Sequence, residues 1–166
     1  MTTKDINTKK GFTIIEVVLV LAIAGLIFLM VFIALPALQR SQRDTQRRDD
    51  MARLLSQLNQ YQANNNGAVP GDSTKFGTFI TDYLIVGGND KFADPSGENY
   101  KVKSFTKCTN ASSCTQKSAA GDYQTGSIAV YQQAKCDGES PSYTPGLNKI
   151  AITYKLEGAG IYCGNI

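Results

Sequence analysis

The chain has 166 residues and a formal net charge of +3, from 17 basic and 14 acidic residues. This length suits one ordinary domain, and the charge is too small for a dedicated nucleic-acid-binding protein. The chain contains no histidine, which excludes Ser-His-Asp and Cys-His catalysis and any metal site that needs imidazole.

The N-terminal part of the chain has the pattern of a membrane segment. Residues 1–11 are polar and carry three lysines, whereas residues 17–38 contain no charged or amide side chain. As a helix, this apolar run is about 33 Å long, enough to cross a bilayer core of roughly 30 Å. The preceding lysines predict a cytoplasmic N-terminus, although the arginines that follow the run oppose this orientation. The run is too long for a conventional signal peptide, and no A-x-A-like cleavage site follows it.

A processing motif precedes the apolar run. The segment Lys9-Lys10-Gly11-Phe12-Thr13-Ile14-Ile15-Glu16 resembles the processing site of type IV prepilins. The resemblance implies that a prepilin peptidase cuts after Gly11 and N-methylates Phe12. Glu16 would then be the fifth residue of the mature protein.

Glu16 is the only charged residue at the start of the apolar helix. A carboxylate inside a membrane costs a few kcal/mol unless it is compensated, so it either stays wet at the interface, is protonated, or pairs with a cation. We favour pairing. The resemblance implies that the cation is the Phe12 amine, of the same or a neighbouring subunit, and that the pair guides assembly. Thr13 can supply a local hydrogen bond.

Gly25 and Pro36 interrupt the apolar run. Because proline removes a backbone donor and clashes with the preceding turn, we expect a kink or an unwound stretch before Pro36. The resemblance implies a helix break between the two residues in assembled filaments, although Pro36 lies about one turn later than the common pattern.

Residues 39–66 predict an amphipathic continuation of the helix. Its apolar stripe consists of Met51, Leu54, Leu55, Leu58 and Tyr61, at helical spacing. The other faces carry all five arginines: Arg40, Arg43, Arg47, Arg48 and Arg53. Interleaved aspartates and missing aromatics argue against nucleic-acid binding, so we expect a solvated or subunit-facing surface. The first polar turns should protrude, and the helix should end near residues 64–67.

The remaining chain predicts short elements. Residues 76–84 have helical spacing behind an N-cap at Asp72 or Ser73, and residues 100–103 alternate as an edge strand. Residues 104–126 are expected to form an exposed loop, with a glycosylation sequon at Asn110. Further strands are expected at residues 128–131, 150–156 and 161–163. We therefore predict an α+β fold in which a long N-terminal helix packs on a small antiparallel sheet, as in pilins.

Four cysteines, Cys108, Cys114, Cys136 and Cys163, lie in the part expected outside the cytoplasm. Their even number in a small external domain predicts disulfides. Of the three connectivities, we favour Cys108–Cys114 and Cys136–Cys163. A zinc site is the alternative, disfavoured because there is no C-x-x-C spacing.

No catalytic constellation is present, so we expect neither an enzyme nor a cofactor. The segment 94–100, DPSGENY, partly resembles the D-P-W-G-N-P-Y segment of type II secretion pseudopilins, which bind calcium nearby. Asp90 and Asp94 are therefore candidate oxygen ligands, although we favour an ordinary turn and predict no metal.

The pattern as a whole resembles a type IV pilin. The expected parts are a cleaved leader (1–11), a transmembrane and filament-core helix (12–38), its amphipathic continuation (39–66) and a globular head (67–166). The resemblance implies a single-pass precursor in the cytoplasmic membrane, processed by the peptidase and polymerised by inner-membrane machinery into an extracellular homo-oligomeric filament. Adhesion, motility and DNA uptake are implied by the family alone. The alternatives are a pseudopilin and an uncleaved membrane-anchored binding module.

Overall fold

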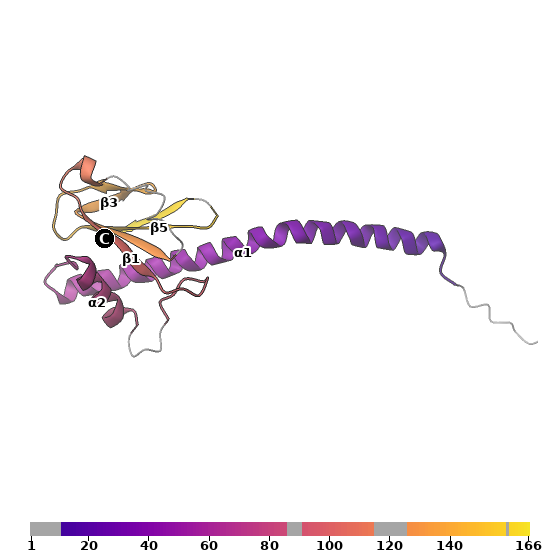
Figure 1. The fold of residues 1–166 in the computed structure, drawn as a ribbon, viewed down its shortest axis with the longest axis horizontal. Helices are drawn as coiled ribbons and strands as arrows, with labels where there is room; N and C mark the ends of the chain where they lie inside the picture. Colours follow the sequence, from indigo (N-terminus) through magenta and orange to yellow (C-terminus); the bar gives the residue numbers. More distant parts are fainter. Residues whose placement is uncertain (1–10, 86–90, 115–125, 159) are drawn as a thin grey trace, which may run out of the picture. The chain divides into compact units, whose positions relative to one another are not determined.

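The computed structural model describes residues 11–85, 91–114, 126–158 and 160–166 (Figure 1). The chain divides into two units, residues 1–39 and 40–166, and the helix α1 (Ile14–Asn64) contributes residues to both. Each unit is described by itself below.

In the first unit, α1 is apolar and exposed. Every large apolar side chain from Val17 to Leu38 is exposed to solvent. Phe32, for example, has 74% of its surface exposed. Within the part of the chain that the structure describes, α1 is the helix long and apolar enough to cross a membrane. This agrees with the membrane segment that the sequence predicts.

The expected helix break is not present in this structure. Helix α1 runs without interruption through Gly25 and Pro36, so the expected unwound stretch before Pro36 was wrong for the isolated chain. A proline removes one backbone donor, and the neighbouring turns keep their hydrogen bonds, which hold the helix together. The break between these residues in an assembled filament stays a prediction.

In the second unit, α1 ends where the sequence predicts. Its last residue is Asn64, and Asn66 and Gly67 adopt positive φ angles of 54° and 80°. The N–H of Gly67 donates to the carbonyl of Gln62 at 2.8 Å. A left-handed backbone that caps the last carbonyls is the usual way in which helices stop.

The short helix α2 (Ser73–Tyr83) also follows the sequence prediction. The carboxylate of Asp72 accepts the backbone N–H of Lys75 at 2.8 Å, as an N-cap. Phe76, Phe79 and Ile80 are buried on one face.

The main sheet has four strands in the order β1 (Lys101–Lys107), β2 (Ser127–Gln132), β5 (Ile150–Lys155) and β6 (Ile161–Asn165). Strands β2, β5 and β6 pair antiparallel, but β1 is parallel to β2. The sheet is therefore mixed, which corrects the expectation of a purely antiparallel one. Residues 108–126 between β1 and β2 are long enough for the crossover that a parallel pair needs.

A second, two-stranded sheet was not predicted. Strands β3 (Ala134–Asp137) and β4 (Ser140–Tyr143) form an antiparallel hairpin, and a 3₁₀ helix, η2 (Ala111–Cys114), follows β1. Gly138, at φ 60°, starts the two-residue turn between β3 and β4, where hairpins often require glycine. Residues 104–114 are thus partly structured, whereas the sequence predicted an exposed loop throughout 104–126.

The four-stranded sheet is covered on both faces within the second unit (Figure 1). On one face, Ile128, Val130 and Ile152 pack with the α1 stripe and with α2. On the other face, Ala129, Tyr131 and Ala151 pack with the cysteines and the β3–β4 hairpin. Strand β2 is buried along its whole length, as expected for a strand covered on both sides.

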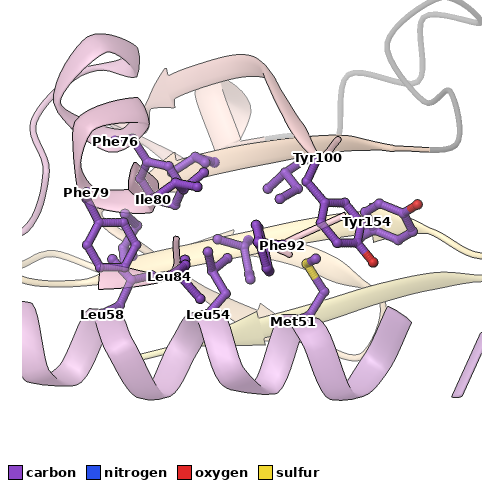
Figure 2. Packing of buried hydrophobic residues seen from close by; sticks show 14 of the residues in the cluster. Met51, Leu54, Leu58, Phe76, Phe79, Ile80, Leu84, Phe92, Tyr100 and Tyr154 are labelled. Atoms are coloured by element: carbon purple, nitrogen blue, oxygen red, sulfur yellow. The ribbon is translucent and has the colours of Figure 1, made fainter. Parts of the chain in front are cut away.

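The larger core is rich in aromatic rings. Figure 2 shows Met51, Leu54 and Leu58 of α1 pointing towards the side chains of α2 and the sheet. The rings of Tyr61 and Phe79 meet edge to face, with their centroids 5.5 Å apart. Such pairs add roughly 0.5–1.5 kcal/mol to the energy of burial alone.

Candidate functional site

The residues of the expected processing site precede the helix. Gly11, Phe12 and Thr13 have no helical structure, and Phe12 is 90% exposed. A Cβ atom placed on Gly11 would have no neighbour within 4 Å among the described atoms. Among the described residues, none covers the peptide bond between Gly11 and Phe12, so a protease can reach it.

Thr13 and Glu16 form a reciprocal cap at the start of α1. Oε2 of Glu16 accepts the backbone N–H of Thr13 at 2.9 Å and its hydroxyl at 2.8 Å, and the N–H of Glu16 donates to the Thr13 hydroxyl at 3.4 Å. This is a capping box, with Thr13 at the N-cap and Glu16 at the third helical position. The sequence T-x-x-E before an apolar run carries this signal, which the sequence analysis did not use.

An apolar hollow lies beside this cap. It measures about 470 Å³ and is lined by Phe12, Glu16, Val17, Val20 and Leu21. The hollow continues the exposed apolar surface of α1. A surface of this extent indicates contact with lipid or with another protein.

The second unit contains a buried cluster of charges that the sequence analysis missed. The side chain of Arg47 on α1 is fully buried, as is that of Asp94 in the segment before β1. Nε and Nη2 of Arg47 donate to the two carboxylate oxygens of Asp94 at 2.6 and 2.8 Å. Nη1 of Arg47 donates to Asp44 at 3.0 Å, and Nη2 also donates to Glu157 at 3.0 Å.

The cluster extends to the turn that follows β5. Asp44 accepts the backbone N–H groups of Glu157 and Gly158 at 2.8 Å each. Glu157 also binds Arg43, at 2.7 Å. Charge-assisted hydrogen bonds of this kind are stronger than neutral ones, so the cluster fastens α1 to the end of β5.

The environment keeps these groups ionised. Hydrogen bonding to Asp94 raises the pKa of Arg47 above its usual range. Burial alone would raise the pKa of Asp94, but hydrogen bonds from Arg47, Ser96 and Tyr154 outweigh it and hold the value well below the usual range. Hydrogen bonds from the donors to Asp44 likewise outweigh burial and lower its pKa. The cluster is therefore a set of charges compensated within the fold.

Two tyrosines complete the cluster. The hydroxyl of Tyr154 donates to Asp94 and accepts the backbone N–H of Gly126 at 2.7 Å. The hydroxyl of Tyr100 donates to Asp50 at 2.8 Å. Burial raises the pKa of both tyrosines above the usual value, helped by the adjacent carboxylates.

These contacts correct two expectations. Arg47 lies in the interior and not on a solvated or subunit-facing surface, and the first turns of this part of α1 contact Asp94 and Glu157 instead of protruding. Asp94 is also occupied: its carboxylate binds Arg47, and Ser96 N–H donates to it at 2.8 Å, as in an ordinary turn. The other calcium candidate, Asp90, lies outside the described residues. Within those residues, there is no group of acidic, cysteine or histidine side chains with metal-binding geometry.

The structure holds both disulfides that the sequence analysis favoured. Cys108 is bonded to Cys114, and Cys136 to Cys163, with Cα atoms 4.9 and 5.8 Å apart. The first bond joins the end of β1 to η2, and the second joins β3 to β6. Both lie on the hairpin side of the main sheet.

Comparisons with known proteins match the N-terminal part of the chain. Residues 6–32 match the family model of the prokaryotic N-terminal methylation motif. A search of curated proteins found no match, and neither did a search of solved structures. The chain carries the class III signal of type IV pilins and prepilin-like proteins, on an α+β fold of pilin-like arrangement.

Proposed function

We propose that this chain is a structural subunit of a type IV pilus. It is held in the cytoplasmic membrane as a precursor, cleaved between Gly11 and Phe12, and polymerised through the apolar part of α1 into a surface filament. The observation that carries the proposal is the methylation motif at residues 6–32, which leads into a helix whose large apolar side chains are exposed. Such a surface needs lipid before assembly and neighbouring subunits after it.

Each part of the chain has a role in this proposal. Residues 1–11 are the cleaved leader, and residues 12–38 hold the precursor in the membrane and then leave the lipid for the filament core. Residues 39–66 continue the helix onto the head, and residues 67–166 form the outer surface. The role is structural and requires no catalytic chemistry of the chain's own.

Glu16 has two roles in the proposed assembly. Both hydrogen bonds that the Glu16 carboxylate accepts from Thr13 use Oε2, and Oε1 accepts no hydrogen bond within the described part of the chain. Cleavage frees the α-amine of Phe12, and its N-methylation in a separate step leaves an ammonium. This ammonium, of the same or a neighbouring subunit, can donate a hydrogen bond to Oε1. One carboxylate then holds the helix start and neutralises a charge that would be costly in an apolar core.

Mass spectrometry of material sheared from the cell surface tests the proposal. The expected product is a chain that begins at N-methylated Phe12 and is four hydrogens lighter than the reduced form, because of its two disulfides. Chain produced without the peptidase serves as the mass standard for the unprocessed form.

Two other results would each indicate a different function. A processed chain found in membranes but not in sheared filaments indicates a pseudopilin of a secretion or DNA-uptake machine. A chain that retains residues 1–11 indicates an uncleaved membrane-anchored binding module.

A further inference from the structure

The capping box at the start of α1 lies beside the peptide bond that the proposed processing would cut. Residues 11–13 are not helical, and α1 begins at Ile14. Oε2 of Glu16 accepts the N–H of Thr13 at 2.9 Å, and this N–H belongs to the peptide bond directly after Phe12. The bond between Gly11 and Phe12 is therefore only one residue away from an amide that is anchored to the helix.

The Gly11 carbonyl lies outside the hydrogen-bond ladder of α1. Within the described residues, the ladder begins at the carbonyl of Thr13, which accepts the N–H of Val17 at 3.4 Å. A carbonyl inside a helix would instead be bonded to the N–H four residues further on. That bond would have to break before a protease could bind the carbonyl. Because α1 begins at Ile14, the Gly11 carbonyl needs no such unwinding.

The polar side chains of the capping box fix the start of the helix. The first N–H groups of a helix have no partner within it, and unpaired N–H groups are costly in apolar surroundings. Here the Thr13 hydroxyl accepts the N–H of Glu16 at 3.4 Å, and the Glu16 carboxylate bonds both the N–H and the hydroxyl of Thr13. Without these partners the start of α1 can move in either direction, and the bond between Gly11 and Phe12 has no fixed conformation.

We propose that Thr13 is a positioning residue for cleavage by the prepilin peptidase. Through its bonds with Glu16, it holds the chain in the conformation that the peptidase binds. This inference rests on the proposed function and adds a determinant that lies after the bond to be cut. In the reaction, water adds to the Gly11 carbonyl carbon and the C–N bond breaks. Gly11 then ends in a carboxylate, and the Phe12 nitrogen leaves as an ammonium. Thr13 takes no part in this chemistry.

Cleavage of the full precursor in detergent by a purified prepilin peptidase tests the proposal. Mass spectrometry of the released peptide 1–11 gives KM and kcat. Thr13→Val keeps the shape of the side chain but cannot cap. Its KM should rise about two- to thirtyfold, the factor by which an N-cap biases a helix start. Its kcat should not change, because only the fraction of precursor that is ready to bind falls.

Matched variants separate the cap from other effects of the side chain. Thr13→Asn changes the shape but is a strong N-cap, and Glu16→Gln retains an acceptor for Thr13, so both should keep the KM of the unmodified chain. Thr45→Val makes the same exchange at an exposed position of α1 in the second unit and should leave both constants unchanged. Far-UV circular dichroism checks that every variant retains its helix.

The outcomes distinguish this inference from the proposed function. Cleavage of the unmodified chain together with an unchanged or lower KM for Thr13→Val overturns the inference and leaves the proposed function intact. A raised KM for Thr13→Asn also overturns it, because the peptidase would then read the threonine side chain itself. If the unmodified chain is not cleaved between Gly11 and Phe12, both are overturned.

Discussion

Arg47 and Asp94 form a bidentate ion pair whose two side chains are both excluded from solvent, although the residues are 47 positions apart in the chain. The pair joins α1 to the segment before β1, and Asp44, Tyr154 and Glu157 extend it to β5. The second unit therefore combines an apolar core with a compensated cluster of charges.

Replacing Arg47 should destabilise the second unit strongly. Arg47→Met leaves Asp94 buried without its counter-charge, which typically costs about 3–5 kcal/mol in the free energy of unfolding. Arg48→Met is the matched control, because Arg48 is exposed, and its effect should stay within about 0.5 kcal/mol. Urea unfolding of the full chain in detergent, monitored by the circular dichroism of its tyrosines, measures the free energy of unfolding of both variants. Equal midpoints for the two variants would contradict the structural role of Arg47.

The stability of the second unit should fall at acid pH. Asp94 has a folded-state pKa below that of the unfolded chain, near 3.9. Its contribution is therefore fully present above about pH 4 and is lost as the pH falls towards the folded value. Asp50 acts in the opposite direction, because burial raises its pKa. Urea midpoints measured between pH 2 and pH 7 should show a smaller acid loss for Asp94→Asn than for the unmodified chain. If the two proteins showed the same pH dependence, Asp94 would not be a source of the loss of stability at acid pH.

The capping box and the charge of Glu16 can be separated by mutation. Thr13→Ala removes the cap and should cost the first turn of α1 about 0.5–2 kcal/mol, seen as faster amide exchange at residues 14–17. Glu16→Gln retains a side-chain acceptor for Thr13 but removes the negative charge. We expect Glu16→Gln to keep slow exchange and to lose filament assembly. Normal filament yield from Glu16→Gln would refute pairing with the Phe12 amine.

The two disulfides should contribute unequally to stability. On the chain-entropy model, Cys136–Cys163, which spans 27 positions, stabilises by about 3–4 kcal/mol, and Cys108–Cys114, which spans six, by about 2 kcal/mol. Replacing each pair by alanines and measuring urea unfolding tests this order. Greater loss from the Cys108–Cys114 variant would mean that the cap on η2 matters more than loop closure.

Much of the fold follows from local patterns in the sequence. The stripe Met51, Leu54 and Leu58 has helical spacing, Asp72 is a recognisable N-cap, and β5 alternates clearly. These signals come from residues close in sequence, so periodicity and capping rules detect them. The same is true of the motif around Gly11 and Phe12.

The missed features depend on contacts between distant residues. The parallel pairing of β1 with β2 leaves no local mark, and β4, with the sequence SPSY, lacks the β-branched alternation of a strand. Arg47 lies four residues before Met51, so helical spacing places it on the buried face of α1, but nothing near it in the sequence shows what compensates its charge. Its burial depends on Asp94 and Glu157, which no helical periodicity connects to it.

The four-stranded sheet places different chemistry on its two faces. Protonation sites that hold α1 in place lie on one side, whereas the cystines lie on the other. Acid and a reducing agent should therefore loosen opposite sides of the same sheet. The disulfide should still hold the β3–β4 hairpin at acid pH, and the ion pairs should still hold α1 under reducing conditions, so neither stress alone removes every cross-link of the second unit.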